Sequence, residues 1–303
     1  MEDDFDLLLK DEVSSHALAS DIAGGHCFGH AGKRIPKGSN ILYGLGSGSI
    51  LKVFRREERD FRDNEALCLE RLSGRLRVDV PELQATGEHD GYPYLIMRRM
   101  LGIPLDTVYD SMGIAERTLV AEAAGGLLKE MHSLPVSTLE GCVPEWSTFI
   151  GSQKDDLADN HAGYGLEHSR IAEVLEFVDD MEPVEEYQEL VVCHTEIMPD
   201  HMFISSDKGS PRLTGLIDFE PSMLAVPQYE LCAVGLFLSG GDPDLYGSLI
   251  DSLEPNYDHS PSTVMRMLLL HRYSNMNRFI GMLPEKLRDA DLMTMAYFWF
   301  GIR

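Results

Sequence analysis

The chain has 303 residues, of which 44% are hydrophobic and 25% charged, as expected for a globular protein with a substantial core in one large domain or two lobes. Its formal net charge of −24 argues against nucleic acid as a partner, because phosphate backbones need lysine and arginine to neutralise them. The same charge favours cationic ligands in a cleft, although acidity can also serve solubility alone, and composition by itself favours that second interpretation.

The first part of the chain predicts a helix followed by a β-meander. Residues 5–20 show partial helical periodicity of leucine and alanine. Residues 25–54 contain short β-type runs separated by a turn at residues 36–40, PKGSN, and a Gly-Ser turn at residues 46–49. Glycine-rich hairpin turns are common and most bind nothing. The sequence has no G-x-x-x-x-G-K-[ST] motif, which excludes a P-loop.

A lysine and a glutamate stand out after this meander. Lys52 interrupts the apolar run ILKVF, and strand alternation places it on the face opposite its two neighbours. An exposed strand lysine is the plain alternative. Glu65 lies near the start of an amphipathic helix, NEALCLERL, with Glu57, Glu58 and Glu70 as nearby alternatives for the same position.

The middle of the chain alternates regular and irregular segments. Two more strands are predicted around the turn at residues 89–91, and the second leads into Arg98, Arg99 and Met100. The plain interpretation of these three residues is the end of an edge strand with solvated arginines. Residues 114–133 predict a clear helix from their apolar periodicity.

Residues 136–168 are polar and irregular. Asp155, Asp156 and Asp159 in this region could meet ammonium groups of a ligand, although a solvated helix face is the plainer interpretation. Residues 169–181 predict a core helix, and three further helices are predicted after residue 240, with methionine and aromatic residues as core material.

Two short stretches in the second half of the chain combine apolar runs with metal-ligating side chains. In residues 191–204, VVCHTEIMPDHMFI, two apolar runs flank a polar turn that carries Glu196 and His201. In residues 213–220, LTGLIDFE, a short apolar strand ends on Asp218. Such strand ends can bring the three side chains together around a metal ion and a transferable group.

The pattern H-T-E-x-x-x-x-H followed by I-D-F-E resembles the catalytic loop and metal-binding aspartate of the aminoglycoside phosphotransferase family, most closely its hygromycin-type members. That family is related to protein kinases. The resemblance implies an α+β, protein-kinase-like two-lobe fold, with an antiparallel-sheet lobe over residues 1–98 and a larger, mainly helical lobe over residues 99–303. It also implies Mg²⁺ as cofactor and ATP or GTP as phosphoryl donor.

Carried over residue by residue, the resemblance gives Glu196 the position of the catalytic base that orients the acceptor hydroxyl. His201 takes the position of a metal-binding asparagine, and Asp218 that of the metal-binding aspartate. This sequence departs from the usual H-G-D-x-x-x-x-N pattern at two of these positions. Glu196 is one methylene longer than aspartate, and magnesium prefers oxygen ligands to imidazole.

The resemblance also assigns a nucleotide-binding role to residues of the first lobe. Gly38, Ser39 and Asn40 occupy the hairpin turn that covers the phosphates. Lys52 and Glu65 correspond to the pair that holds the α- and β-phosphates. The stretch of Arg98, Arg99 and Met100 corresponds to the hinge whose backbone pairs with the purine edge.

For the acceptor, the resemblance implies a small cationic molecule, with an aminoglycoside as the leading candidate. Glu220 is the first candidate for a carboxylate that faces the substrate, followed by Asp159. Glu230 is a third candidate, although its first interpretation is a structural one, the anchoring of a loop.

We therefore expect a phosphotransferase that inactivates an antibiotic and so confers resistance. Two alternatives are a kinase-like protein that binds nucleotide or ligand with little activity, and a kinase for another small molecule, because fold-level likeness does not separate them. Five cysteines without a C-x-x-C pair predict reduced thiols and a cytoplasmic location, and the sequence predicts neither a signal peptide nor a membrane span. We expect a monomer or dimer.

Overall fold

The structure is a computed structural model that describes residues 4–180, 183–186, 188–205 and 209–302. The chain divides into two compact units. The first comprises residues 1–101 together with the segment Gly215–Pro221, and the second comprises Gly102–Thr214 and Ser222–Arg303. We predicted a single division after residue 98. The sequence patterns did not reveal that the short segment carrying Asp218 packs with the first unit.

The first unit is built on a five-stranded antiparallel sheet with the order β1-β2-β3-β5-β4. Its strands and helices are β1 (Ala31–Ile35), β2 (Ile41–Leu45), β3 (Ser49–Val53), β4 (Leu83–His89), β5 (Tyr92–Arg98), α1 (Asp4–Lys10), α2 (Glu12–Gly25) and α3 (Arg59–Leu72). The predicted turns therefore lie where the sequence placed them, between β1 and β2, between β2 and β3, and between β4 and β5.

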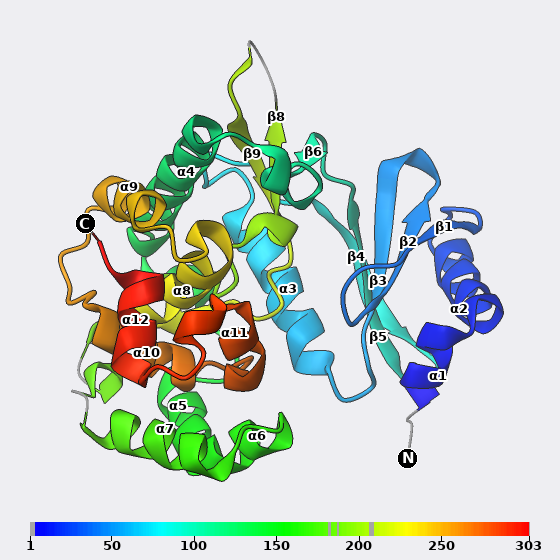
Figure 1. Ribbon diagram of the computed structural model, residues 1–303. Coiled ribbons are helices and arrows are strands. Elements are labelled where there is room, and N and C mark those ends of the chain that lie inside the picture. The colour runs from blue at the N-terminus through cyan, green and yellow to red at the C-terminus, as the bar shows by residue number, and fades with distance from the viewer. Residues whose placement is uncertain (1–3, 181–182, 187, 206–208, 303) are drawn as a thin grey trace. The chain divides into compact units, whose positions relative to one another are not determined.

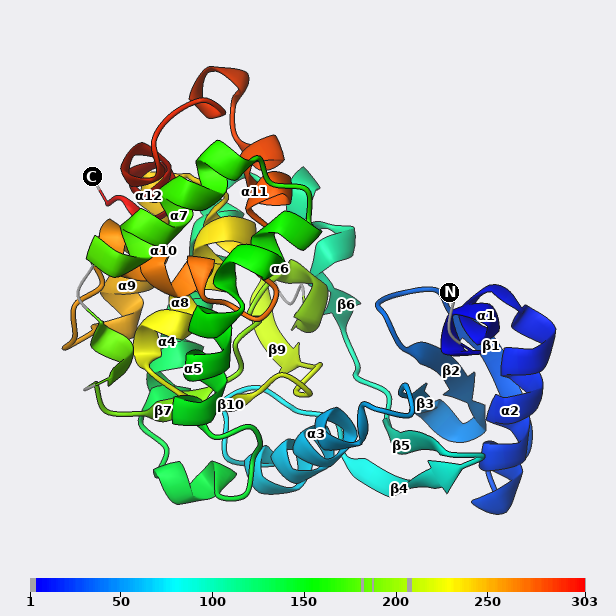
Figure 2. The ribbon, with the colours of Figure 1, turned by 90° about the horizontal axis from the view of Figure 1, so that it is seen from below.

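The two faces of this sheet are covered by different helices, as Figures 1 and 2 show with α2 on one side and α3 on the other. Alternate residues of β2, β3 and β5, including Tyr43, Leu51 and Tyr94, form a buried apolar core with α1 and α2. Because side chains alternate along a strand, Lys52 projects from the other face, toward α3. The packing of the sheet thus decides which partners this lysine meets.

The helix predicted over residues 5–20 is in fact two helices. Asp11 interrupts it, because its side-chain Oδ1 accepts hydrogen bonds from the backbone N–H groups of Val13 at 3.0 Å and Ser14 at 3.3 Å and so caps α2. An aspartate that satisfies the first free N–H groups of a helix favours a new helix start over the continuation of the preceding one.

The second unit is mainly helical. Its helices are α4 (Ile114–His132), α5 (Trp146–Asp155), α6 (Leu157–Gly163), α7 (His168–Asp180), α8 (Pro227–Ala233), α9 (Pro243–Leu253), α10 (Pro261–Leu269), α11 (Met276–Met282) and α12 (Leu292–Phe300). A π-helical segment, Val234–Ser239, continues α8. In this unit α4 packs along α9, and α10 packs against α8 and α12.

Short strands in this unit hold the polar turn identified in the sequence. β7 (Val191–Cys193) pairs with β10 (Met223–Ala225) in a two-stranded sheet. In a second, three-stranded sheet, β8 (Met202–Ser205) lies between β6 (Ile103–Pro104) and β9 (Arg212–Leu216). The last two residues of β9 belong to the first unit. The polar turn runs from the end of β7 to the start of β8. These elements confirm the prediction of an antiparallel sheet in the N-terminal part and a larger helical part after it. Among the residues described, no helix has the length and apolar character needed to cross a membrane.

Candidate active site

Lys52 is the centre of a buried charge cluster in the first unit. Its Nζ lies 2.5 Å from Oδ1 of Asp218, 2.8 Å from Oε2 of Glu65 and 2.8 Å from Oε2 of Glu220. The lysine side chain is 5% exposed and that of Glu65 is fully buried, whereas Asp218 keeps 29% of its side chain exposed. The structure thus brings together a strand lysine, a helix glutamate and the aspartate of the I-D-F-E motif, and places Asp218 at the accessible edge of the cluster.

The four members of the cluster come from three parts of the chain. Lys52 comes from β3, Glu65 from α3, and Asp218 and Glu220 from the segment that follows β9. Asp218 has φ of +71°, a left-handed conformation that aspartate tolerates better than most residues. Leu216 at the end of β9 donates its N–H to the carbonyl of Asp79, which fixes the start of this segment within the first unit.

Burial and charge shift the pKa values of the cluster. Burial acts to lower the pKa of Lys52, but Asp218, Glu220 and Glu65 outweigh it and raise this pKa well above its ordinary value. Burial raises the pKa of Glu65 to about 7, against the opposing effect of Lys52. The second carboxylate oxygen of Glu65, Oε1, is buried and has no hydrogen-bond partner among the described residues. Three carboxylates around one lysine leave an excess of negative charge that suits a cation.

The pH dependence of stability follows from the raised pKa of Glu65, together with that of Glu230, which burial also raises to about 7. A carboxyl with a folded pKa above its unfolded value of 4.5 binds its proton more tightly in the folded state. Its stabilising contribution is full below pH 4.5 and is lost as pH rises through 7. We expect the melting temperature to fall between pH 6 and pH 8, as scanning calorimetry would measure.

The net charge of the chain acts in the same direction, so a variant is needed to isolate the buried carboxyl. Glu65→Gln should flatten the dependence of the melting temperature on pH. Glu176→Gln, at an exposed position of α7, makes the same change of charge and should leave the slope unchanged. A melting temperature that rises from pH 6 to pH 8 would contradict the raised pKa values.

The three residues predicted to cover the phosphates differ in their exposure to solvent. Gly38 and Ser39 are exposed in the turn between β1 and β2, and Gly38 has φ of +72°, which favours glycine at this position. Asn40 is 7% exposed and donates from Nδ2 to Oε2 of Glu220 at 2.9 Å. Asn40 therefore joins the charge cluster, while the other two residues remain available at the surface.

Two of the predicted hinge amides are already used by the sheet. The N–H of Arg98 donates to the carbonyl of Glu82 and that of Arg99 to the carbonyl of Gly48, each at 2.8 Å. The Arg98 side chain is 62% exposed and pairs with Glu82 on the surface. A purine edge therefore cannot take up these two N–H groups without breaking the sheet, and Met100 is the first predicted hinge residue beyond them.

In the second unit, Glu230 anchors the polar turn that follows β7. Its carboxylate is fully buried and accepts hydrogen bonds from the N–H groups of His194 at 2.6 Å and Thr195 at 3.0 Å. Thr195 has φ of +74°, which is unusual for a β-branched residue, so the turn is held in a strained conformation. The suggestion that Glu230 faces a substrate is inconsistent with this burial, whereas the anchoring role fits it.

His201 and Glu196 lie together in the same turn. Nδ1 of His201 is 2.8 Å from the carbonyl oxygen of Glu196, and because a carbonyl only accepts, Nδ1 carries the proton and Nε2 keeps its lone pair. A carboxylate oxygen of Glu196 and a ring nitrogen of His201 lie within 4.8 Å of one another. The turn therefore offers one carboxylate and one oriented imidazole, and an imidazole fixed in this way can serve as a metal ligand.

The remaining substrate candidates have different surroundings. Glu220 was the first candidate for a substrate-facing carboxylate, but it is occupied by Lys52 and Asn40. Its place two residues after Asp218 was visible in the sequence, whereas its contact with Lys52 depends on the fold. Asp159 is exposed on α6, and Asp155 at the end of α5 and Asp156 between the two helices are exposed as well. The structure thus leaves these exposed aspartates as candidates and assigns Glu220 to the lysine cluster.

Comparisons with known proteins show the family and the fold of the chain. A model of the phosphotransferase enzyme family matches residues 39–259. The GDP complex of wild-type aminoglycoside 2'-phosphotransferase-IIIa is similar in structure, with a TM-score of 0.68 and 16% sequence identity over 96% of this chain and 97% of that chain. The streptomycin–ATP–APH(2")-IIa ternary complex gives a TM-score of 0.57 and 16% identity over 96% of this chain and 98% of that chain.

A macrolide 2'-phosphotransferase, MphH from Brachybacterium faecium, gives a TM-score of 0.59 and 15% identity over 92% of this chain and 97% of that chain. These similarities confirm the predicted two-lobe, kinase-like α+β fold. The closer likeness to hygromycin-type members stays a prediction. Because the family model covers more than half of the sequence, this chain belongs to the phosphotransferase enzyme family.

Proposed function

We propose that this protein transfers the γ-phosphoryl group of ATP or GTP to a hydroxyl group of a small cationic antibiotic, with an aminoglycoside as the leading acceptor. The observation that carries the proposal is the contact of Lys52 with both Glu65 and Asp218, which lie 13 and 166 residues away along the chain. A buried lysine held by a helix glutamate and by the aspartate of the I-D-F-E motif is the arrangement with which kinase-like enzymes bind nucleotide phosphates.

Each residue of the proposed site has a distinct role. Lys52 would neutralise the α- and β-phosphates, and Glu196 would orient the acceptor hydroxyl and accept its proton. The acidic surface, including Asp159, would attract the ammonium groups of the acceptor. Such reactions depend mainly on positioning and charge neutralisation, so these few groups suffice.

The donor set fits a divalent cation. Asp218 offers carboxylate oxygens, the ligands that Mg²⁺ prefers, and its side chain is partly exposed. His201 offers Nε2, since its Nδ1 is bonded to the carbonyl of Glu196. Bound there, Mg²⁺ would neutralise charge on the nucleotide phosphates. The proposed ligands are therefore Asp218 and His201, with imidazole as the less usual member of the pair.

The alternative is a protein that binds nucleotide but transfers phosphate slowly, and Glu196 is the residue that favours it. A carboxylate displaced by one methylene can lose about 100-fold in rate if the acceptor is misplaced by about 1 Å. An assay with Mg²⁺ and either ATP or GTP against a panel of aminoglycosides and macrolides distinguishes the two. Acceptor-dependent release of ADP or GDP supports the enzyme, whereas nucleotide binding without turnover on any acceptor supports the alternative.

Substitution of Glu196 tests its role as the base. Glu196→Gln keeps the size of the side chain but cannot accept the proton, so we expect kcat to fall by about 100-fold or more. Glu196→Asp should alter kcat without abolishing transfer, because it keeps the carboxylate and changes only its reach. Steady-state kinetics at saturating nucleotide measure both. Full turnover by Glu196→Gln would mean that another group takes the proton.

A further inference from the structure

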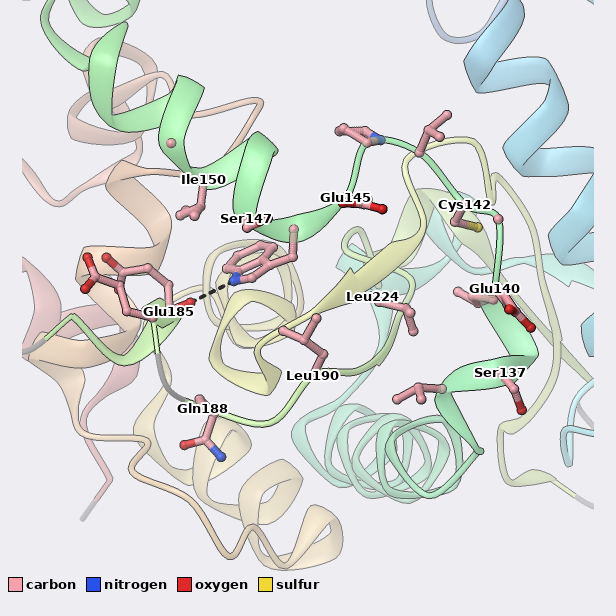
Figure 3. Close-up of a pocket in the computed structure, with 18 of the residues that line it drawn as sticks. Ser137, Glu140, Cys142, Glu145, Ser147, Ile150, Glu185, Gln188, Leu190 and Leu224 are labelled. Carbon is pink, nitrogen blue, oxygen red and sulfur yellow. Dashed lines mark hydrogen bonds between the residues drawn. The ribbon is translucent and has the colours of Figure 1, made fainter.

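A cavity of about 1020 Å³ opens in the second unit (Figure 3). Its walls come from the loop before α5, from α5 itself, from β10, and from Glu185, Glu186, Gln188 and Leu190. Neither Glu196 nor His201 lines it. The volume is at the upper end of the range for pockets that hold small molecules.

The inner surface of the cavity is largely apolar. Trp146 and Ile150 from α5 are each 5% exposed, and the indole N–H of Trp146 is bonded to the carbonyl of Glu185 at 3.0 Å. Leu190 and Leu224 face the same space from the side opposite α5 (Figure 3). An aliphatic or aromatic group placed between these walls would be removed from water on two sides, which favours its binding.

The charged residues around the cavity are mainly acidic. Four glutamates line it, and among the described lining residues Lys154 is the only basic side chain. Lys154 is already paired, with its Nζ 2.9 Å from Glu185 and 2.7 Å from Glu186. Arg266 adds a second cation to the buried Glu185. The two remaining glutamates, Glu140 and Glu145, are exposed and form no ion pair with described residues, so they give the entrance a negative potential.

We propose that this cavity binds a small amphiphilic cation, with an ammonium or guanidinium head at Glu140 and Glu145 and an apolar body against Trp146 and Leu224. The combination of apolar walls and unpaired carboxylates decides the class of ligand. An anion would be repelled at the entrance, and a small hydrophilic cation would gain nothing from the walls. Leu224 lies in β10, which pairs with β7, the strand that precedes the turn carrying Glu196.

The test uses n-octylammonium as probe and isothermal titration calorimetry on the full chain, with n-octanoate as the probe of opposite charge. We expect saturable binding of one equivalent of octylammonium and none of octanoate. The double variant Glu140→Gln with Glu145→Gln should weaken octylammonium binding by about 5-fold, as expected for two partly exposed charge contacts. Glu176→Gln, outside the cavity, should not change it.

A second variant fills the cavity. Gly151 lines it on α5, and a Cβ added there meets nothing within 4 Å, so Gly151→Phe places a ring in the cavity without a clash at its Cβ. Gly151→Phe should abolish octylammonium binding, whereas Gly151→Ala should keep it. Gly163→Phe, at an equally open helix position outside the cavity, should also keep it.

Four outcomes would overturn the proposal: no saturable binding of octylammonium, equal binding of octanoate, undiminished binding by the glutamine double variant, or undiminished binding by Gly151→Phe. If Gly151→Phe does not fold, the glutamine double variant still decides the question, because its substitutions lie at exposed positions. Quenching of tryptophan fluorescence by the probe, lost in Trp146→Phe, gives an independent check that the ligand is at the cavity.

Discussion

Replacing Asp218 with alanine should abolish phosphoryl transfer and leave the protein folded. The substitution removes a carboxylate proposed to bind Mg²⁺ and one of the three groups that hold Lys52. We expect kcat to fall by about 1000-fold or more, because both the metal and the lysine act on charge that develops in the transition state. The fold should persist because the side chain is 29% exposed and Lys52 keeps Glu65 and Glu220 as partners.

The matched control is Glu220→Ala, which removes another carboxylate from Lys52 two residues further along the chain. It should lower kcat much less than Asp218→Ala, since Glu220 has no proposed part in metal binding. Steady-state kinetics give the rates, and circular dichroism with a melting curve confirms the fold. An Asp218→Ala protein that is folded and keeps a large part of the wild-type kcat would remove Asp218 from the proposed site.

The residues proposed for the site could be selected from the sequence because they lie in short local patterns. Glu196 and His201 share one polar turn between two apolar runs, and Asp218 directly follows a strand. Lys52 interrupts an apolar strand, but it was the family resemblance, with its order of strand lysine and helix glutamate, that made this lysine a candidate. The fold class followed from the resemblance of these stretches to the aminoglycoside phosphotransferase family, whereas the spacing of apolar residues predicted only the individual strands and helices.

What the sequence did not reveal depends on tertiary packing. The contact of Glu220 with Lys52 and Asn40 requires the segment after β9 to lie against the first sheet, and no local pattern encodes that. The occupied N–H groups of Arg98 and Arg99 likewise depend on the neighbouring strand and on Gly48. Residues 136–168 seemed irregular in sequence because α5 and α6 are short and follow each other closely.

The turn that carries Glu196 is strained, and the buried carboxylate of Glu230 holds it in place. Loss of Glu230 should therefore affect this turn strongly. Two backbone N–H groups, of His194 and Thr195, point at its carboxylate. Glu230→Ala would remove the carboxylate that accepts from both buried N–H groups and would open a cavity in the core. We expect a loss of about 2 to 5 kcal/mol in the free energy of unfolding.

The same substitution should reduce catalysis beyond its effect on stability. Loss of the carboxylate removes a contact that stabilises the left-handed conformation of Thr195, so the turn should relax. A shift of about 1 Å in Glu196 can cost about 100-fold in rate, so kcat per folded molecule should fall by about that factor. Glu230→Gln should be intermediate, because its amide oxygen can accept one of the two N–H groups while its NH₂ opposes the other.

Gln228→Ala is the control for Glu230→Ala, because it distinguishes loss of the hydrogen bonds to the turn from a general destabilisation of α8. Gln228 is as buried as Glu230 and lies on the same helix, but its side chain donates to the carbonyl of Asp258, outside the turn. It should lower the melting temperature and leave kcat per folded molecule nearly unchanged.

Hydrogen exchange in a peptide covering His194 and Thr195 should rise in Glu230→Ala and not in Gln228→Ala. If both variants lost kcat equally, or if the exchange of these amides did not change, the carboxylate of Glu230 would be a packing group and the turn would be held by other contacts.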